Sequence, residues 1–331
     1  MSVKLVHSQV VKGARIVLVG EAPGAQEERT GLPFVGASGE LLSRCLQKAG
    51  LRRSDITITN VFKVRPDNNN VKVFLDLSKS KPIKTAVYHE SLEILKMEIE
   101  QWKPTVVCAL GAVPLYALCG ETSIMKWRGS ILESTLVKGQ KVVPTIHPAA
   151  ALRQYVLAYP IIWDLQRVKE ESENPKIVRP NRTYIIEPTF KETMDYLNSC
   201  RSPLAFDIEV MREEVSCISF SYDPMVAISI PFINEQGKDY WSLEEEKIVW
   251  TKIKGILEDR GIEKVAQNGI FDISFLFQKC GIITQGLVGD SMIGWAQLFP
   301  DLSKSLGFIC SVLTKEPYYK DVLQKSKGGF G

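Results

Sequence analysis

The sequence lacks features that would place it in a special class. It has no run of eighteen or more apolar residues, and its first fifteen residues lack the apolar centre of a signal peptide. We therefore expect a cytoplasmic protein with no membrane partner. It also lacks an excess of one charge, because 41 basic and 38 acidic residues leave a net charge of +3. Any groove that binds nucleic acid must therefore be a local feature.

Paired cysteines are absent as well. The seven cysteines form no C-x-x-C pair and no Cys/His cluster at zinc spacing. Most stand in apolar segments, which favours reduced thiols in a hydrophobic core. They are Cys45, Cys108, Cys119, Cys200, Cys217, Cys280 and Cys310.

The length predicts two domains, because 331 residues exceed the roughly 250 to 300 at which single cores stop growing. The composition changes at residues 171–182, ESENPKIVRPNR, which carry charge and two prolines but no apolar period. We therefore predict a first domain over 1–170, a linker over 171–182 and a second domain over 183–331.

Alternating strands and helices predict an α/β first domain. The apolar, mostly β-branched run from Ile16 to Val19 indicates a buried strand that stops at Gly20. Glycines and prolines then predict a loop at the strand's carboxyl end, where open α/β sheets place their ligands. Helical spacing resumes near Ala37. Further strands are expected at 56–59, 105–110, 131–137 and 141–146, helices at 86–101, 115–118 and 160–170, and a long loop at 71–85.

The sequence motifs of this loop are more specific than its composition. Its spacing differs from the phosphate-binding G-x-x-x-x-G-K-[ST] and G-x-G-x-x-G patterns, so we set nucleotide binding aside. The strings GEAPG, PFVG and the following G-x-LL within Arg15 to Leu42 closely resemble the first motif of the family four uracil-DNA glycosylases. The resemblance covers roughly residues 15–170 and implies a three-layer α/β/α domain with a parallel central sheet.

The resemblance assigns a role to each residue of a base pocket that includes Gly20. Phe34 would stack on an everted uracil, Asn60 would read its edge, and His147 would donate to the departing anion. Glu21 would position water or support the cationic sugar. Taken singly, each residue type has a more common structural role. A glutamate after a strand is usually solvated, a phenylalanine usually lies in the core, an asparagine at a strand end usually belongs to a turn, and a loop histidine is often simply hydrogen-bonded to its neighbours.

The resemblance also carries expectations about DNA contact and about a cofactor. Leu152 would be an apolar wedge in the minor groove and Arg153 a phosphate contact. The family usually carries a four-cysteine iron-sulfur cluster. Here no cysteine pair precedes the first strand, and Val64 stands where the family has a cysteine, so no cluster is expected.

The second domain is predicted to contain a mixed sheet and an acidic site. Strands are expected at 184–186, 204–210, 215–222, 225–232 and 264–266, and helices at 190–197, 243–258, 270–278, 291–298 and 303–313. Asp207 and Glu209 lie two apart on one strand and therefore share a face. Asn268 and Asp272 lie four apart at the start of a helix, on one side of it.

Such carboxylates can hold two Mg²⁺ or Mn²⁺ ions for phosphodiester hydrolysis. D-x-E followed by N-x-x-x-D is similar to the first two motifs of the DEDD-type proofreading 3′ to 5′ exonucleases. The similarity implies a ribonuclease H-like fold, metal binding by Asp207, Glu209 and Asp272, and DNA contact by Asn268. The alternative for D-x-E alone is a solvated edge strand.

The end of the chain narrows the resemblance to family A, polymerase I-like DNA polymerases. Asp290 stands in a D-[ST]-M string as a structural residue, and Pro317 to Asp321 resembles phage members. The third motif, Y-x-x-x-D, is not found, so we expect weak or no exonuclease activity from this chain. Polymerase motifs are not found either, so nucleotide incorporation is not expected.

These resemblances together predict the amino-terminal portion of a phage DNA polymerase in the host cytoplasm. It would excise or recognise uracil in DNA and contribute metal-dependent proofreading. Its partners would be uracil-containing DNA, single-stranded 3′ ends and the remainder of the polymerase. Two alternatives are an idle pocket that binds DNA and tethers the polymerase, and a docking module for replication partners.

Overall fold

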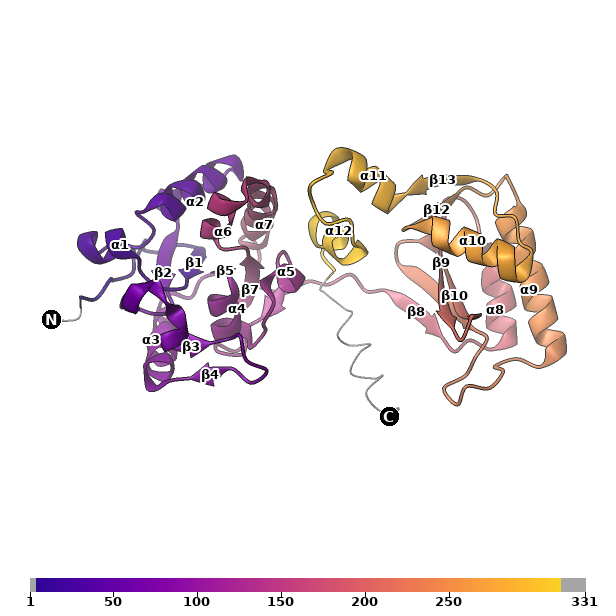
Figure 1. The fold of residues 1–331 in the computed structure, drawn as a ribbon, viewed down its shortest axis with the longest axis horizontal. Helices are drawn as coiled ribbons and strands as arrows, with labels where there is room; N and C mark the ends of the chain where they lie inside the picture. Colours follow the sequence, from indigo (N-terminus) through magenta and orange to yellow (C-terminus); the bar gives the residue numbers. More distant parts are fainter. Residues whose placement is uncertain (1–3, 317–331) are drawn as a thin grey trace. The chain divides into compact units, whose positions relative to one another are not determined.

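The computed structural model describes residues 4–316 (Figure 1). The chain divides into two compact units: the first takes the chain up to Arg179 and again from Gly307, and the second takes Pro180–Leu306. The first division falls inside the predicted linker. The described residues from Gly307 onward pack with the first unit, although the sequence assigns them to the second domain, and the predicted domain bounds stay a prediction.

The first unit is built on a five-stranded sheet with the strand order β2-β1-β5-β7-β6. The first four strands are parallel, which confirms the predicted parallel sheet, and only β6 runs antiparallel, at the edge. The strand expected at 131–137 is therefore only a short edge strand. The bounds are β1 Ile16–Gly20, β2 Thr57–Asn60, β5 Val106–Leu110, β6 Leu132–Glu133 and β7 Lys141–Thr145.

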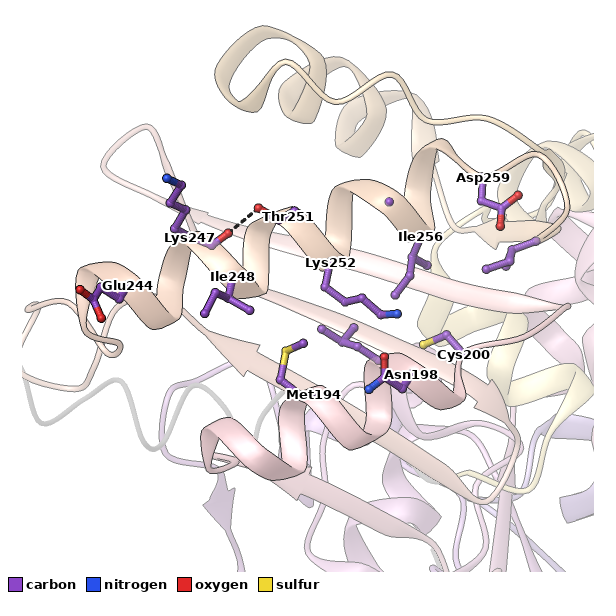
Figure 2. Close-up of a pocket in the computed structure, with 13 residues that line it drawn as sticks. Met194, Asn198, Cys200, Glu244, Lys247, Ile248, Thr251, Lys252, Ile256 and Asp259 are labelled. Carbon is purple, nitrogen blue, oxygen red and sulfur yellow. Dashed lines mark hydrogen bonds between the residues drawn. The ribbon is translucent and has the colours of Figure 1, made fainter.

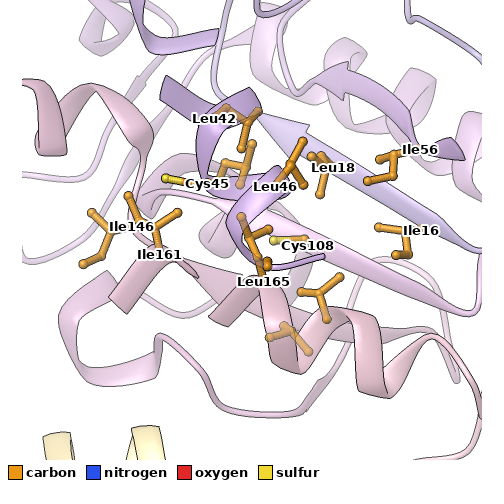
Figure 3. Packing of buried hydrophobic residues seen from close by; sticks show 14 of the residues in the cluster. Ile16, Leu18, Leu42, Cys45, Leu46, Ile56, Cys108, Ile146, Ile161 and Leu165 are labelled. Carbon is orange, nitrogen blue, oxygen red and sulfur yellow. The ribbon is translucent and has the colours of Figure 1, made fainter. Parts of the chain in front are cut away.

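Helices cover both faces of this sheet because alternate strand residues point to opposite sides. Ile16 and Leu18 pack in one cluster with Leu46 of α2 and Leu165 of α7 (Figure 3). Val17 and Val19 pack in the cluster on the other face. The result is the predicted three-layer arrangement. The helices are α1 Ala25–Thr30, α2 Ala37–Lys48, α3 Ala86–Trp102, α4 Ala112–Cys119, α5 Ile124–Trp127, α6 Pro148–Arg153 and α7 Ala158–Glu171, with 3-10 turns at Arg53–Asp55, Asp67–Asn69, Val71–Val73 and Tyr155–Leu157.

The segment 71–85, predicted as a loop, folds over the core instead. It contains the antiparallel pair β3 (Leu75–Asp76) and β4 (Ile83–Lys84). Leu75 is fully buried, and the ring of Phe74 lies 4.9 Å from that of Phe62. Burial of these side chains stabilises a segment whose local sequence has no strong period.

The second unit is a six-stranded mixed sheet with the order β13-β12-β9-β10-β11-β8. β9, β10 and β11 form an antiparallel meander, and β12 and β13 add in parallel beside β9. This topology confirms the predicted ribonuclease H-like sheet. The elements are β8 Thr183–Ile186, α8 Phe190–Ser199, β9 Leu204–Met211, β10 Glu214–Asp223, β11 Val226–Pro231, α9 Leu243–Glu258, β12 Lys264–Ala266, α10 Gly269–Cys280, β13 Leu287–Asp290 and α11 Ser291–Leu298. The helix that follows, α12 Leu306–Leu313, belongs to the first unit from Gly307 onward.

The end of α12 is bound by two arginines of the first unit. Arg128, fully buried, donates to Asp164 and to Ser311 Oγ at 2.7 Å. Arg167 donates to the carbonyls of Ser311 and Val312 at 2.9 and 3.1 Å. Arg167 therefore satisfies two of the carbonyls that a helix leaves exposed at its carboxyl end, and Arg128 binds a hydroxyl group of the same turn. Within residues 4–316, no helix has the length and apolar character needed to cross a membrane.

Candidate functional sites

A cavity of about 640 Å³ opens in the first unit, where β1, β2 and β7 end. Parallel strands present their carboxyl ends at the same edge, which is where this fold class places its ligands. The cavity brings together the predicted residues of the base pocket except Gly20, which is not part of its lining. The predicted residues in its lining are Glu21, Phe34, Asn60, His147, Leu152 and Arg153.

Gly20 allows the ring and the amide of the pocket to approach the end of β1. A Cβ at this position would lie 2.3 Å from Asn60 Oδ1 and 2.5 Å from two ring carbons of Phe34. Any side chain would therefore displace both groups. The parallel register places Gly20 directly beside Asn60, so the close approach follows from the pairing of β1 with β2.

Asn60 presents a buried but available amide. The residue is 5% exposed, and within residues 4–316 its side-chain amide makes no hydrogen bond. Buried polar groups in proteins are nearly always hydrogen-bonded. An amide in this state can therefore both donate to and accept from a ligand that enters the cavity.

Phe34 is held in an unusual backbone conformation. Its φ of 55° is in the left-handed region, which a bulky residue adopts rarely and at a cost of about 1 to 3 kcal/mol. Gly39 permits this, since a Cβ there would lie 1.9 Å from the carbonyl oxygen of Phe34. The ring centroids of Phe34 and His147 are 5.9 Å apart, so the two rings form one wall of the pocket.

His147 is the N-cap of α6 and is neutral at physiological pH. Its Nδ1 accepts a hydrogen bond of 3.1 Å from the amide of Ala149. Burial and, to a smaller extent, the nearby charge of Arg153 lower the pKa of His147 to about 4, while Glu27 opposes the shift. Because Nδ1 accepts, the proton of the neutral ring is assigned to Nε2, which is left to donate.

Two glutamates near the pocket differ in their roles. Glu21 follows β1 directly and lines the cavity, where burial raises the pKa of its carboxyl group. Glu27, which is 8% exposed, accepts from the amides of Gly24, Val35 and Gly36 at 3.1 to 3.2 Å. It therefore joins the GEAPG loop to the loop that carries Phe34. Sequence reasoning missed Glu27, although its place three residues after the Gly24 helix cap was a usable signal.

The two residues predicted to contact DNA beside the base pocket, Leu152 and Arg153, both line the cavity. Leu152 on α6 is 48% exposed, and Arg153 ends the same helix. An apolar side chain exposed beside the cavity fits the geometry of a wedge, but its role stays a prediction.

The acids of the second unit lie on neighbouring elements. Asp207 and Glu209 are both exposed on β9, while Phe206 and Ile208 between and beside them are buried, as the period of two predicted. Asp272, 4% exposed on α10, accepts from the amide of Ile208 at 2.9 Å. Burial raises the pKa of Asp272, and Asp290 and Glu209 add to the rise.

These acids do not form a ready ligand set. Among residues 4–316, no group of three or more histidine, cysteine or acidic side chains lies close enough to hold a metal ion. Carboxylate oxygens are the donors that Mg²⁺ and Mn²⁺ prefer, so the chemistry of Asp207, Glu209 and Asp272 fits such ions. The string from Pro317 to Asp321 lies outside the described residues, as do residues 322–331.

Asn268 and Asp290 shape the start of α10. Asn268 is a left-handed N-cap with φ of 59°. The carboxylate of Asp290 accepts from the amides of Asn268 and Gly269 and from those of Met292 and Ile293. Burial alone would raise the pKa of Asp290, but these four bonds outweigh it and lower the pKa. Asp290 therefore acts as a structural residue.

A larger cavity, of about 790 Å³, lies between α8 and α9 (Figure 2). Its lining mixes apolar side chains, such as Met194 and Ile248, with polar and charged ones, and the side chain of Lys252 extends between the two helices. It contains none of the predicted site residues.

The cysteines of the first unit do not fit an iron-sulfur cluster. Cys45 and Cys108 are buried in the core on one face of the sheet, Cys119 is buried on the other face, and the fourth cysteine, Cys310, lies on α12. Burial raises the pKa of the thiols of Cys45, Cys108 and Cys119, which disfavours the thiolates that ligate metals. The positions of these cysteines offer no site at which four thiolates could bind a cluster. The expected absence of the cluster stays a prediction.

The first unit is an α/β domain whose parallel sheet presents a cavity at its carboxyl edge. The cavity brings together an aromatic ring, an amide and a neutral histidine. The second unit has a mixed sheet in which an antiparallel meander is extended by two parallel strands.

Comparison with known proteins identifies the family. Residues 7–164 match the model of the uracil DNA glycosylase superfamily, and residues 185–327 match that of a 3′-5′ exonuclease. The type-4 uracil-DNA glycosylase of Thermotoga maritima is 41% identical over 141 residues, 42% of this chain and 67% of that protein. The enzyme of Archaeoglobus fulgidus is 36% identical over 163 residues, 47% of this chain and 76% of that protein. The chain belongs to the type-4 uracil-DNA glycosylase family, with a 3′-5′ exonuclease domain following the glycosylase domain.

A third relative spans both domains. The DNA polymerase of Bacillus phage SP01 is 26% identical over 327 residues, which cover 88% of this chain and 33% of the polymerase. The chain therefore spans one third of the length of this relative and is similar to it in both domains.

Proposed function

We propose that the first unit excises uracil from DNA. The observation that carries the proposal is the buried amide of Asn60, without a hydrogen bond inside the described chain, between the ring of Phe34 and the donor of His147. Uracil is flat and carries adjacent acceptor and donor atoms on one edge. Phe34 would stack on its face and Asn60 would pair with its edge.

The reaction breaks the bond between the base and C1′ of the sugar. The bonding electron pair leaves with uracil, whose developing negative charge would be stabilised by the hydrogen bond from His147 Nε2. Glu21 would orient the water that adds to C1′ and would stabilise the cationic sugar when ionised. The proton released by the water ends on the departing base, so the products are free uracil and an abasic sugar.

An oligonucleotide with a single uracil tests this proposal. The protein should release uracil and leave a strand that alkali cleaves at that position. A strand that stays uncut at a large excess of protein contradicts the activity. Asn60→Ala should lose both excision and selective binding of the uracil strand.

We further propose that the second unit hydrolyses DNA from 3′ ends with Mg²⁺ or Mn²⁺ as part of a larger DNA polymerase. Asp207, Glu209 and Asp272 would hold the ions, which would activate water and stabilise the leaving oxygen, and Asn268 would contact the strand. Activity from this chain alone should be weak, because these three acids do not converge within residues 4–316. Brisk Mg²⁺-dependent digestion that Asp207→Ala abolishes would contradict the expected weakness.

A pocket that binds uracil without cutting is the second candidate. The observation in its favour is that the cysteines of this unit do not fit the cluster expected of its relatives. Such a pocket would hold or pause the polymerase at uracil. In that case the uracil strand binds, Asn60→Ala weakens the binding, and no base is released. If Asn60→Ala changes neither binding nor excision, the unit is a docking module for replication partners instead.

A further inference from the structure

Lys63 stands at the centre of a compact polar cluster behind the pocket. Its Nζ donates to Glu98 Oε2 at 2.6 Å and to the carbonyl oxygen of Asn60 at 2.9 Å. The third proton of the ammonium group reaches Thr59 Oγ1. Ser8 Oγ completes the cluster by donating to Glu98 Oε1 at 2.6 Å. These four residues, Lys63, Glu98, Thr59 and Ser8, are called the polar clasp below.

The clasp joins four separate segments of the first unit. Ser8 comes from the chain before β1, Thr59 from β2, Lys63 from the loop after β2, and Glu98 from α3. The amide of Val6 also donates to the carbonyl oxygen of Lys63 at 2.8 Å. The side chains of Lys63 and Glu98 are only 11% and 19% exposed. Solvent screens an ion pair in this position weakly, so each charge depends on its partner.

Asn60 is held between the clasp and β1. Its carbonyl group accepts from Lys63, and the next two amides, of Val61 and Phe62, donate to the carbonyls of Gly20 and Glu21 at 2.9 and 3.0 Å. Hydrogen bonds from the clasp and to the end of β1 therefore both hold the backbone of the Asn60 loop. The side-chain amide is left free to face the cavity.

The clasp occupies the part of the chain where the resembled family carries cluster cysteines. Two of those positions were identified from the sequence: the segment before the first strand, which supplies Ser8, and Val64, which follows Lys63. The cysteines present here do not fit a cluster. An ion pair with hydroxyl partners connects the same segments instead.

We propose that the polar clasp positions Asn60 in the uracil pocket without metal. Lys63 and Glu98 act through the backbone of Asn60, so they are positioning residues and touch no substrate. Their effect on uracil rests on the function proposed above, whereas their effect on the Asn60 loop does not. Burial lowers the pKa of Lys63, while Glu98 opposes the shift, so the clasp should loosen at alkaline pH.

Hydrogen exchange at the backbone amides of Val61 and Phe62 tests the clasp directly, because both residues follow Asn60 in the loop that the clasp holds. In the full chain, Lys63→Met should speed their exchange by about tenfold or more, since Glu98 is left buried and unpaired. The double variant Lys63→Met with Glu98→Leu removes both charges and should restore part of the protection. Arg52→Met is the matched control, because it breaks an exposed pair with Asp55, 82% and 51% exposed, outside the clasp.

Kinetics and iron content separate positioning from a general loss of stability. Lys63→Met should lower kcat more than it raises KM, and Lys63→Arg should recover part of kcat. The purified protein should contain no stoichiometric iron and should keep the protection of Val61 and Phe62 in the presence of a chelator. Unchanged exchange in both Lys63→Met and Glu98→Gln, or bound iron whose removal exposes the loop, would overturn the proposal. If the wild-type protein releases no uracil, the glycosylase proposal fails, and the exchange measurement still decides on the clasp.

Discussion

The pocket of the first unit and the acids of the second unit differ in how far the folded chain alone assembles them. In the first unit, Phe34, Asn60 and His147 already meet around one cavity, and Gly20 packs against Phe34 and Asn60. In the second, Asp207, Glu209 and Asp272 lie on adjoining elements, but the described chain gathers no metal-binding group. The difference follows from chemistry. Neutral rings and amides can pack together without a ligand, whereas like-charged carboxylates repel each other until a cation joins them.

The largest expected effect concerns the donor of the first unit. His147→Ala should reduce the single-turnover rate of uracil release by about 10² to 10³-fold, because one hydrogen bond to the departing anion is lost. Digestion of 3′ ends should not change. If the variant impairs both activities, the two sites are not independent in this test, and the result would indicate a general folding defect.

Gly20→Ala should be next in size, at about 10²-fold in the same rate. The added methyl group would meet Asn60 and the ring of Phe34 and would displace both. Gly255→Ala is the matched control, since a Cβ there has no neighbour within 4 Å and lies in the helix α9. The control should keep full activity and gain stability of about 0.5 to 1 kcal/mol. Equal effects of the two variants would contradict the tight packing at Gly20.

A smaller effect is expected on the pH dependence of stability, which should show the titration of His147 in the first unit only. The pKa of His147 is about 4 in the folded protein and near 6.5 in the unfolded chain, so the unfolded state binds the proton first. The melting temperature of the first unit should therefore fall as the pH is lowered from about 6.5 to 4. His147→Gln should flatten this fall, and calorimetry can measure it. A fall of the same size in the variant would assign the titration to another group.

The smallest effect should come from metal binding to the second unit. Mg²⁺ or Mn²⁺ should raise the melting temperature of this unit by a few degrees through mass action and leave that of the first unit unchanged. Asp207→Asn should abolish the shift. If the first unit is stabilised as well, a metal contributes to it, and the contrast between the two sites must be redrawn.

The sequence predicted best what depends on local patterns. The strand at Ile16–Gly20 and the alternation of Phe206, Asp207 and Ile208 follow from periodicity, and both are present. Membership of the glycosylase family was predicted from the sequence motifs of the loops. The short helix α1 escaped prediction, because six residues between glycines are too few to show a period.

Contacts between distant segments could not be predicted in the same way. Glu27 accepts from amides up to nine residues away, and Lys63 pairs with Glu98 35 positions later. Neither pairing leaves a local signal. The α12 helix shows the same limit, because Arg128 and Arg167, which bind it, lie 183 and 144 positions before their partner Ser311.

Uracil release in a chelator, measured at excess protein over a single-uracil strand, separates the two sites in one experiment. Because we propose that the pocket of the first unit works without a metal, the wild-type protein should release uracil at the same rate with EDTA or with Mg²⁺. Asn60→Ala should release none, and any trimming of 3′ ends should occur only with the metal. A uracil strand that remains uncut in both buffers, or release that EDTA abolishes, would contradict a preformed, metal-free glycosylase pocket.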